Sequence, residues 1–260
     1  MNFSRQAFLL LFFILVLSHV KSVDCPFEQN YISLWGQQNM RILDQRWEVQ
    51  LTLDQNSGSG FQSVQSYGFG WFSMRIKLPK KDSTAVITTF YLISDTGTTR
   101  DEIDFEFLGG NLNQPPILHT NIYINGQDFH DYTLLLNEKH IVFFVDGTPI
   151  RVFKNSKDKG GSYRTQAMKV YATIWTNPWG SNGVPINWND APFEAHYRSF
   201  GINACQAQST NLQPCNYSSK YWWNAQKFLE LNPLQKQAYN NVRNSYLFYN
   251  YCTKQTTTKS

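Results

Sequence analysis

Short runs of β-forming residues, each followed by a turn signal, restrict the fold of this 260-residue sequence more than any other feature. Several runs alternate polar and apolar residues, and the Asp146-Gly147 pair between two of them is a strong β-hairpin signal. Helical periodicity is missing until the end of the chain. The pattern predicts an all-β sandwich or barrel. The runs are 48–53, 70–78, 86–93, 141–145, 150–153 and 170–175.

The composition changes after about Phe200, where loop-like sequence replaces the strand pattern. A helix is then predicted to begin at Asn232, which can cap it, with Pro233 in the first helical position and Gln235 closing a capping box. We therefore expect a β domain over residues 23–203 and a C-terminal extension with one helix over residues 204–260.

The first residues match a secretory signal peptide. Arg5 supplies a short positive region, and 7–17 (AFLLLFFILVL) is an unbroken apolar run. That run is shorter than the ~20 residues a membrane-spanning helix needs, and Ser22 occupies a plausible cleavage position after it. We expect residues 1–22 to be removed and the remainder to leave the cytosol. A short membrane anchor is the alternative.

All four cysteines lie beyond the predicted signal, and an even number in an exported chain indicates disulfides. Four cysteines allow three pairings. Cys205 and Cys215 close a short loop and are the natural first pair, which leaves Cys25 and Cys252 to join the two ends of the chain. Asn216 opens an Asn-x-Ser sequon and is a candidate glycosylation site.

The charge distribution argues against a nucleic-acid partner. The net charge of +4 falls to +2 without Arg5 and Lys21, and no dense Lys/Arg stripe remains. Metal-ligand spacings such as CxxC and HxxxH are absent from the sequence, so we expect neither a metal nor another cofactor.

Residues 100–109 (RDEIDFEFLG) carry the chemistry. Side chains alternate between the faces of a strand, so Glu102, Asp104 and Glu106 share one face while apolar residues fill the other. Like charges this close raise one another's pKa values. A solvated strand face would more often include Thr, Ser or Lys.

A retaining glycosidase needs such a set, because one carboxylate attacks the anomeric carbon while another protonates the leaving oxygen. The spacing poses a difficulty: Cα atoms four residues apart on a strand are separated by roughly 13–14 Å, whereas the two carboxyl groups must approach to about 5–5.5 Å. Long Glu side chains on a twisted strand could meet this demand. An acidic solvent-exposed face and a cation site are the alternatives.

Tryptophans provide a second indication, because aromatic faces stack on sugar rings. Trp175, Trp179 and Trp188 lie in a Gly-, Asn- and Pro-rich stretch, WTNPWGSNGVPINW. Core packing is the alternative, particularly for Trp188, and a structural role is the alternative for an isolated histidine in a strand. The further candidates for the cleft are Tyr91, His119, Thr120 and Asn121.

The segment DEIDFEFLG resembles the active-site signature of the xyloglucan endotransglucosylase/hydrolases in glycoside hydrolase family 16. The resemblance continues in VQLTLDQNSGSGFQS, YGFGWFSMRIKLP, ILHTNIY, IVFFVDGTPIRVFKN and INWNDAPFEAHYRSF, in the family's order. It implies a concanavalin-like jelly-roll β-sandwich with a concave cleft, and a C-terminal extension that lengthens the acceptor side. It also implies a secreted, monomeric enzyme of the cell wall and apoplast, with xyloglucan as donor and acceptor.

The resemblance implies roles for individual residues as well. Glu102 would be the nucleophile, Glu106 the acid/base and Asp104 the residue that modulates the nucleophile. The implied glucan contacts come from His119, Thr120 and Asn121, and from Trp179 with Gly183.

The sequence departs from the family after Gln127, where it passes directly to Asp128. The family normally has about a dozen or more further residues here, with an Arg-Glu-Gln element and an aromatic strand, and losing a strand exposes new sheet edges. A skipped exon, a natural short form and a damaged gene model would each explain the gap. The chain also ends soon after Cys252, before the partner cysteine usual in the family, and lacks a sequon after the signature.

Three functions remain open. The leading hypothesis is a transglucosylase that passes the glycosyl-enzyme to another xyloglucan chain. The second is a xyloglucan endohydrolase, because the region that would shield the intermediate from water is the one that is shortened. The third is an impaired, glucan-binding wall protein.

Overall fold

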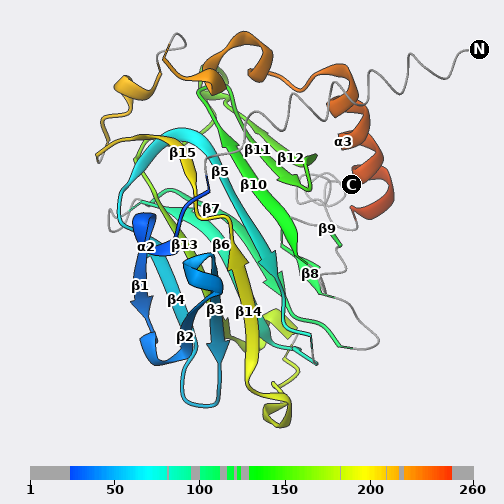
Figure 1. The fold of residues 1–260 in the computed structure, drawn as a ribbon. Helices are drawn as coiled ribbons and strands as arrows, with labels where there is room; N and C mark the ends of the chain where they lie inside the picture. The colour runs from blue at the N-terminus through cyan, green and yellow to red at the C-terminus, as the bar shows by residue number, and fades with distance from the viewer. Residues whose placement is uncertain are drawn as a thin grey trace, which may run out of the picture.

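The computed structural model describes residues 24–80, 82–94, 100–111, 116–119, 122–123, 129–181, 183–208, 210–216 and 220–247. In this part of the chain, two antiparallel sheets pack face to face, with the helix α3 at one edge (Figure 1). The predicted all-β sandwich is therefore confirmed. The predicted signal peptide, Thr120, Asn121 and Cys252 lie outside the described residues. No helix within these ranges is long and apolar enough to cross a bilayer.

The sheet that carries the acidic segment, sheet A, has the strand order β1-β4-β13-β6-β7-β8-β9. Its strands are β1 (Tyr31–Trp35), β4 (Ser59–Ser63), β13 (Lys169–Thr176), β6 (Val86–Ile93), β7 (Glu102–Leu108), β8 (Ile117–Leu118) and β9 (Ile122–Tyr123). The short helix α2 (Phe27–Asn30) precedes β1.

The opposing sheet B has the order β12-β11-β10-β5-β14-β3-β2, with β15 also paired to β5. Its strands are β12 (Thr148–Lys154), β11 (His140–Val145), β10 (His130–Leu136), β5 (Tyr67–Lys77), β14 (Phe193–Arg198), β3 (Glu48–Leu53), β2 (Met40–Leu43) and β15 (Ile202–Gln206). The hairpin predicted at Asp146-Gly147 joins β11 to β12, and both turn residues have positive φ angles of 48° and 76°.

The core between the sheets anchors β7. Phe105 is fully buried and stacks on Phe90 of β6 at 5.8 Å between ring centroids. Its ring also meets Tyr132 of β10 and Phe143 of β11 at 5.6 and 5.2 Å. These contacts place β7 over β10 and β11. With one face of β7 held against the core, its acidic residues must point outward.

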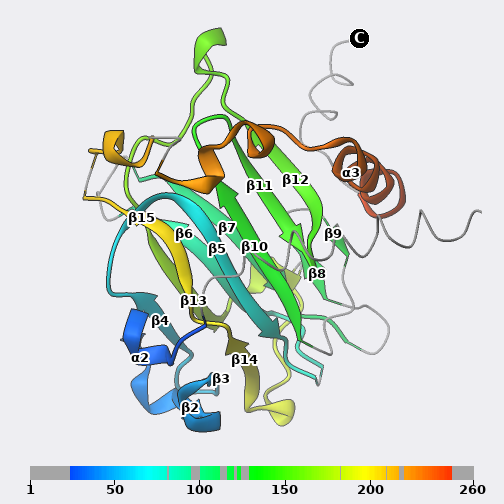
Figure 2. The same ribbon diagram turned by 45° about the horizontal axis from the view of Figure 1, so that its top comes forward.

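The C-terminal segment packs on the outer face and edge of sheet B. The predicted Cys205–Cys215 disulfide is present, and the Asn137 side chain donates hydrogen bonds to the Trp223 and Phe228 carbonyls. Helix α3 (Pro233–Tyr246) begins with the predicted capping box and contacts β12 (Figure 2). The suggested pairing of Cys25 with Cys252 is not formed, since Cys25 is a buried free thiol.

On the far side of β7, the described part of sheet A covers only the end of that strand. Strand β8 pairs with β7 only at Phe107 and Leu108, and the His119 amide donates a hydrogen bond to the Glu106 carbonyl at 2.7 Å. Within the described residues, the part of β7 from Glu102 to Phe105 pairs with β6 alone.

Candidate active site

The carboxylates of β7 line the outer face of sheet A, as predicted. Along the strand, Ile103, Phe105 and Phe107 are buried, whereas the three acids between them are exposed or partly exposed. The alternation confirms that Glu102, Asp104 and Glu106 share one face.

The neighbouring strands continue this face with aromatic and hydroxyl side chains. Tyr91 of β6 lies opposite Asp104, and Tyr171 of β13 lies opposite Tyr91. The two tyrosine rings stack at 5.2 Å between centroids. One row along, Thr89 and Thr173 are joined by a 2.7 Å hydrogen bond between their hydroxyl groups. Thr89 and Thr173 are buried, whereas Tyr91 and Tyr171 are half-buried, so the tyrosine pair offers the stacking surface beside the acids.

The three carboxylates have different environments. Glu102 forms an ion pair with Arg100, with 3.2 Å between Nε and Oε2. Burial raises the pKa of Asp104 to about 7, and the charges of Glu102 and Glu106 add to this effect. Its Oδ1 atom is buried without a hydrogen-bond partner among the described residues. In mildly acidic solution Asp104 is therefore protonated, and it lies between Glu102 and Glu106 on the strand.

Glu106 is held beside an aromatic pair. His119 Nδ1 lies 3.3 Å from Glu106 Oε2, and the His119 ring stacks on Trp179 at 5.6 Å. Trp179 remains 46% exposed, so its free surface is available to a ligand next to Glu106.

The loop that carries Trp179 closes over one end of this face. A Cβ atom on Gly180 would lie 3.2 Å from Ile87 Cδ1, and this close approach favours glycine. Gly183 follows with φ +86°, a left-handed conformation that glycine adopts readily. Trp175 is half-buried on β13 at the same end. Trp188 instead packs against the core near Phe193, so the core-packing alternative is confirmed for it.

Trp35 was missed by the sequence reasoning. A Cβ atom on Gly58 or Gly60 would lie 2.9 or 3.1 Å from the Trp35 ring, so the ring covers the backbone of both glycines. Trp35 pairs with Gly60 of β4, and Gly60 pairs with Thr173 of β13. Through Thr89 this line of paired residues across the sheet reaches Glu106. Trp35 is 38% exposed. Gly58 and Gly60 indicate in the sequence that a large side chain covers this backbone. They do not identify Trp35 as that side chain, because it lies more than twenty positions earlier in the sequence.

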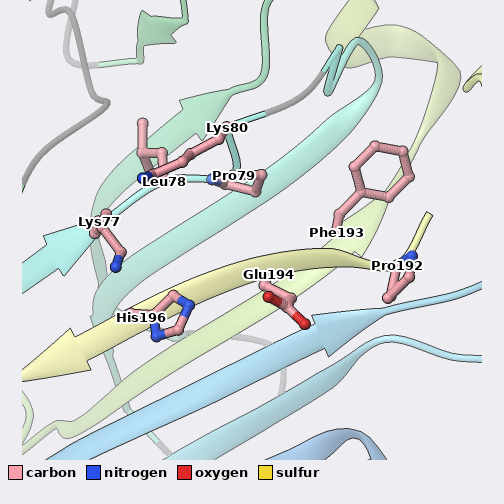
Figure 3. Close-up of a pocket in the computed structure, with 8 residues that line it drawn as sticks. All are labelled: Lys77, Leu78, Pro79, Lys80, Pro192, Phe193, Glu194 and His196. Carbon is pink, nitrogen blue, oxygen red and sulfur yellow. The ribbon is translucent and has the colours of Figure 1, made fainter. Parts of the chain in front are cut away.

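A second hollow, of about 340 Å³, lies on the outer face of sheet B between the end of β5 and β14 (Figure 3). Lys77, Lys80, Glu194 and His196 contribute its polar groups, and His196 Nδ1 lies 2.6 Å from Glu48 Oε1. The acidic trio lies on sheet A, so this hollow is separate from it.

The sequence is similar to known glucan-modifying proteins. The profile of the family described as Glycosyl hydrolases family 16 matches residues 27–190. Xyloglucan endotransglucosylase/hydrolase protein 2 of Arabidopsis thaliana is 42% identical over 247 residues, covering 87% of this chain and 84% of that protein. Xyloglucan endotransglucosylase protein 2 of Diospyros kaki is 41% identical over 252 residues, covering 90% and 85%.

Solved structures with low sequence identity share the fold. The Bacillus licheniformis beta-glucanase has a TM-score of 0.53 at 20% identity, covering 72% of this chain and 99% of its own. The apo Crh5 transglycosylase has a TM-score of 0.54 at 16% identity, covering 78% and 92%. These likenesses confirm the predicted jelly-roll fold.

Proposed function

This chain belongs to the xyloglucan endotransglucosylase/hydrolases of glycosyl hydrolase family 16, and we propose that it cleaves the β-1,4-glucan backbone of xyloglucan with retention and transfers the fragment to a second xyloglucan chain. The observation that carries this proposal is the row of three acids on the outer face of β7, in three different environments. Two carboxyl groups in different protonation states are what a double displacement requires.

In this mechanism Glu102 attacks the anomeric carbon while Glu106 gives its proton to the departing glycosidic oxygen. Glu106 then takes a proton from the acceptor hydroxyl, the acceptor oxygen bonds to the anomeric carbon, and the bond to Glu102 breaks. The Oδ1 atom of Asp104 has no hydrogen-bond partner in the described structure, so protonated Asp104 would be free to donate a hydrogen bond to Glu102 and position it when substrate is bound. His119 holds the Glu106 carboxylate in place.

The sugar chain crosses the strands of sheet A. Tyr91, Tyr171 and Trp35 lie on the β6–β13–β4–β1 side of the acids and form the donor half of the cleft. Trp175, Trp179 and Gly183 close the cleft beside Glu106, while Thr120 and Asn121, the further contacts that the resemblance implies, lie outside the described residues. The acceptor half lies beyond β7, where sheet A is short and where the extension after residue 203 adds surface.

A labelled xyloglucan oligosaccharide, incubated with polymeric xyloglucan, tests the proposal. We expect label to enter the polymer without new reducing ends, and NMR of early products to show the β-anomer. New reducing ends without incorporation of label would support an endohydrolase instead. Among the described residues, Glu102 to Phe105 of β7 pair with β6 alone, and this open edge favours the second candidate, since water can reach the intermediate there. Xyloglucan binding with neither product would leave only a glucan-binding role.

Asp104→Asn is expected to lower kcat/KM by roughly tenfold near pH 5.5, since an amide donates a weaker hydrogen bond and 1.4 kcal/mol is a factor of ten. The wild type should lose activity as the pH rises through about 7, because Asp104 then ionises beside Glu102 and Glu106. The amide of the variant carries no such charge, so the alkaline decline should disappear. A pH profile of kcat/KM for both proteins measures this; an unchanged decline would assign it to another group.

Asp104 also makes stability pH-dependent. Its folded pKa of about 7 exceeds its unfolded value, so the folded state binds more protons between these pH values and the free energy of unfolding falls as the pH rises. Denaturant titrations at pH 4.5 and 7.5 should show a smaller loss for Asp104→Asn than for the wild type.

Trp179→Ala is expected to raise the KM for xyloglucan about tenfold. The variant loses one aromatic stacking surface, which contributes about 1.4 kcal/mol to the binding free energy. The His119 ring loses its support in the same variant, so kcat should also fall. Trp47→Ala removes a tryptophan that is 38% exposed outside this site and provides the control. Equal effects of the two substitutions on KM would exclude Trp179 from the cleft.

We further propose that the protein acts as a secreted monomer in the cell wall and apoplast after cleavage near Ser22, with residues 23–203 as the catalytic domain and 204–260 as its extension. Asn216 is exposed beside Cys215, which suits a glycosylation site.

A further inference from the structure

A cavity of about 390 Å³ opens beside Glu102, on the side of β7 where none of the described strands pairs with Glu102 to Phe105. Its walls come from β7, β11 and β12 and from the loop that contains Tyr163 and Arg164. Because Phe105 places β7 over β10 and β11, the inner face of sheet B continues past the open edge of β7. The cavity therefore adjoins the acceptor half of the proposed cleft.

One wall of the cavity is an aromatic surface. The rings of Phe153 and Tyr163 stack at 6.1 Å with 9° between their planes. Phe153 is 42% exposed, although its neighbours on β11 are buried. An exposed aromatic face of this kind stacks on the C–H face of a sugar ring and needs no ionic contact.

Two arginines give the cavity a preference for negative charge. The Arg151 guanidinium lies 5.7 Å from the Phe143 ring centroid, and in the described structure it forms no ion pair with a carboxylate. Arg164 is only 6% exposed and donates hydrogen bonds to the Gly68 and Gln166 carbonyls. Its buried Nε–H has no acceptor among the described residues. Arg164 therefore adds positive charge to the cavity wall from a buried position, and Arg151 is the arginine that a ligand can reach.

The charge of the cavity changes during catalysis. Asp101 Oδ2 accepts hydrogen bonds from the backbone amides of Thr165 and Gln166. Glu102 forms its ion pair with Arg100. When the glycosyl group is esterified to Glu102, that carboxylate loses its charge and Arg100 loses its partner. The cavity then has an excess of positive charge, and an acidic acceptor is attracted at the stage when an acceptor is needed.

We propose that this cavity is a lateral acceptor subsite for a glycosyl unit bearing a carboxylate, a uronic acid, which pairs with Arg151 while its ring stacks on Phe153. The inference rests on the proposed transfer function. The acceptor hydroxyl bonds to the anomeric carbon, its proton goes to Glu106, and the ester bond to Glu102 breaks, as with a neutral acceptor. The carboxylate takes no part in the bond changes and acts only in binding.

Two acceptors that differ in one group test the subsite in the full mature chain. One is a glucan oligosaccharide carrying a single glucuronic acid as the free acid, and the other is its methyl ester. We expect the KM of the ester to exceed that of the acid by on the order of fivefold, the effect of one charge pair at a partly solvated site. In Arg151→Gln the ratio should fall to about one, and in the control Arg41→Gln, on β2, it should persist. A ratio of one in the wild type, or a ratio retained in Arg151→Gln, would overturn the proposal.

A binding measurement separates this subsite from the proposed function. Glu102→Gln removes the same charge that esterification removes, so calorimetry should show the free acid binding several-fold more tightly to this variant than to the wild type, with no gain for the ester. If the variant binds the free acid more tightly but the wild type transfers nothing to neutral xyloglucan, the proposed function is rejected and the subsite is kept. If the wild type transfers to neutral acceptors but the variant binds acid and ester equally, the subsite is rejected and the proposed function is kept.

Discussion

Glu102→Ala is expected to remove transfer and hydrolysis together, with a fall in kcat on the order of 10³-fold or more, the scale seen when a covalent nucleophile is lost. No other described carboxylate can take its place, because Asp104 is protonated below pH 7 and Glu106 is held at the other end of the row by His119. The initial rate of label incorporation measures the loss. Binding of xyloglucan should persist, because the aromatic floor is untouched.

Adding azide to the Glu102→Ala protein tests whether the missing carboxylate is the nucleophile. With an aryl β-glycoside donor, whose leaving group departs without much help, azide can enter the space left by the carboxylate. It attacks once, with inversion, so an α-glycosyl azide is expected. Glu194→Ala is the matched control, since it removes an exposed carboxylate from the hollow on sheet B and should change the rate little. Wild-type turnover in Glu102→Ala would falsify the assignment of the nucleophile.

Glu106→Ala should lower the rate on xyloglucan by about 10²- to 10⁴-fold, the contribution of a positioned general acid and base. The loss should be far smaller in the first step with an aryl β-glycoside, because that leaving group needs no proton. The glycosyl-enzyme should then accumulate, since no base activates the acceptor. A burst of released phenol followed by a slow phase, together with the glycosyl-enzyme mass on Glu102, are the measurements.

The azide product separates this variant from the first. Azide needs no general base and attacks the accumulated glycosyl-enzyme, so a β-glycosyl azide forms. An α-azide from Glu106→Ala, or equal losses on xyloglucan and the aryl donor, would contradict its role as acid/base. His119→Ala should show the same dependence on the leaving group in weaker form, because His119 acts through Glu106.

Several features followed from the sequence alone because they depend on local geometry. Strand alternation placed Glu102, Asp104 and Glu106 on one face, and the burial of Ile103, Phe105 and Phe107 bears this out. The turn at Asp146-Gly147 and the capping box of α3 are set by residues within a few positions of one another. The resemblance of the same local segments to a known family predicted the jelly-roll fold and the substrate class.

Other features were decided by the tertiary structure. His119, Trp179 and Glu106 meet because β8 and the loop after β13 converge over the end of β7. Trp35 joins the same face through pairing of β1, β4 and β13.

The sequence thus determined which acids share a strand face, because side-chain alternation needs no knowledge of distant residues. The pKa of Asp104, the cavity beside Arg151 and the identity of the aromatic floor depend on burial and on cross-strand register. Those quantities arise only when strands far apart in the chain are brought together, so only the folded structure decided them.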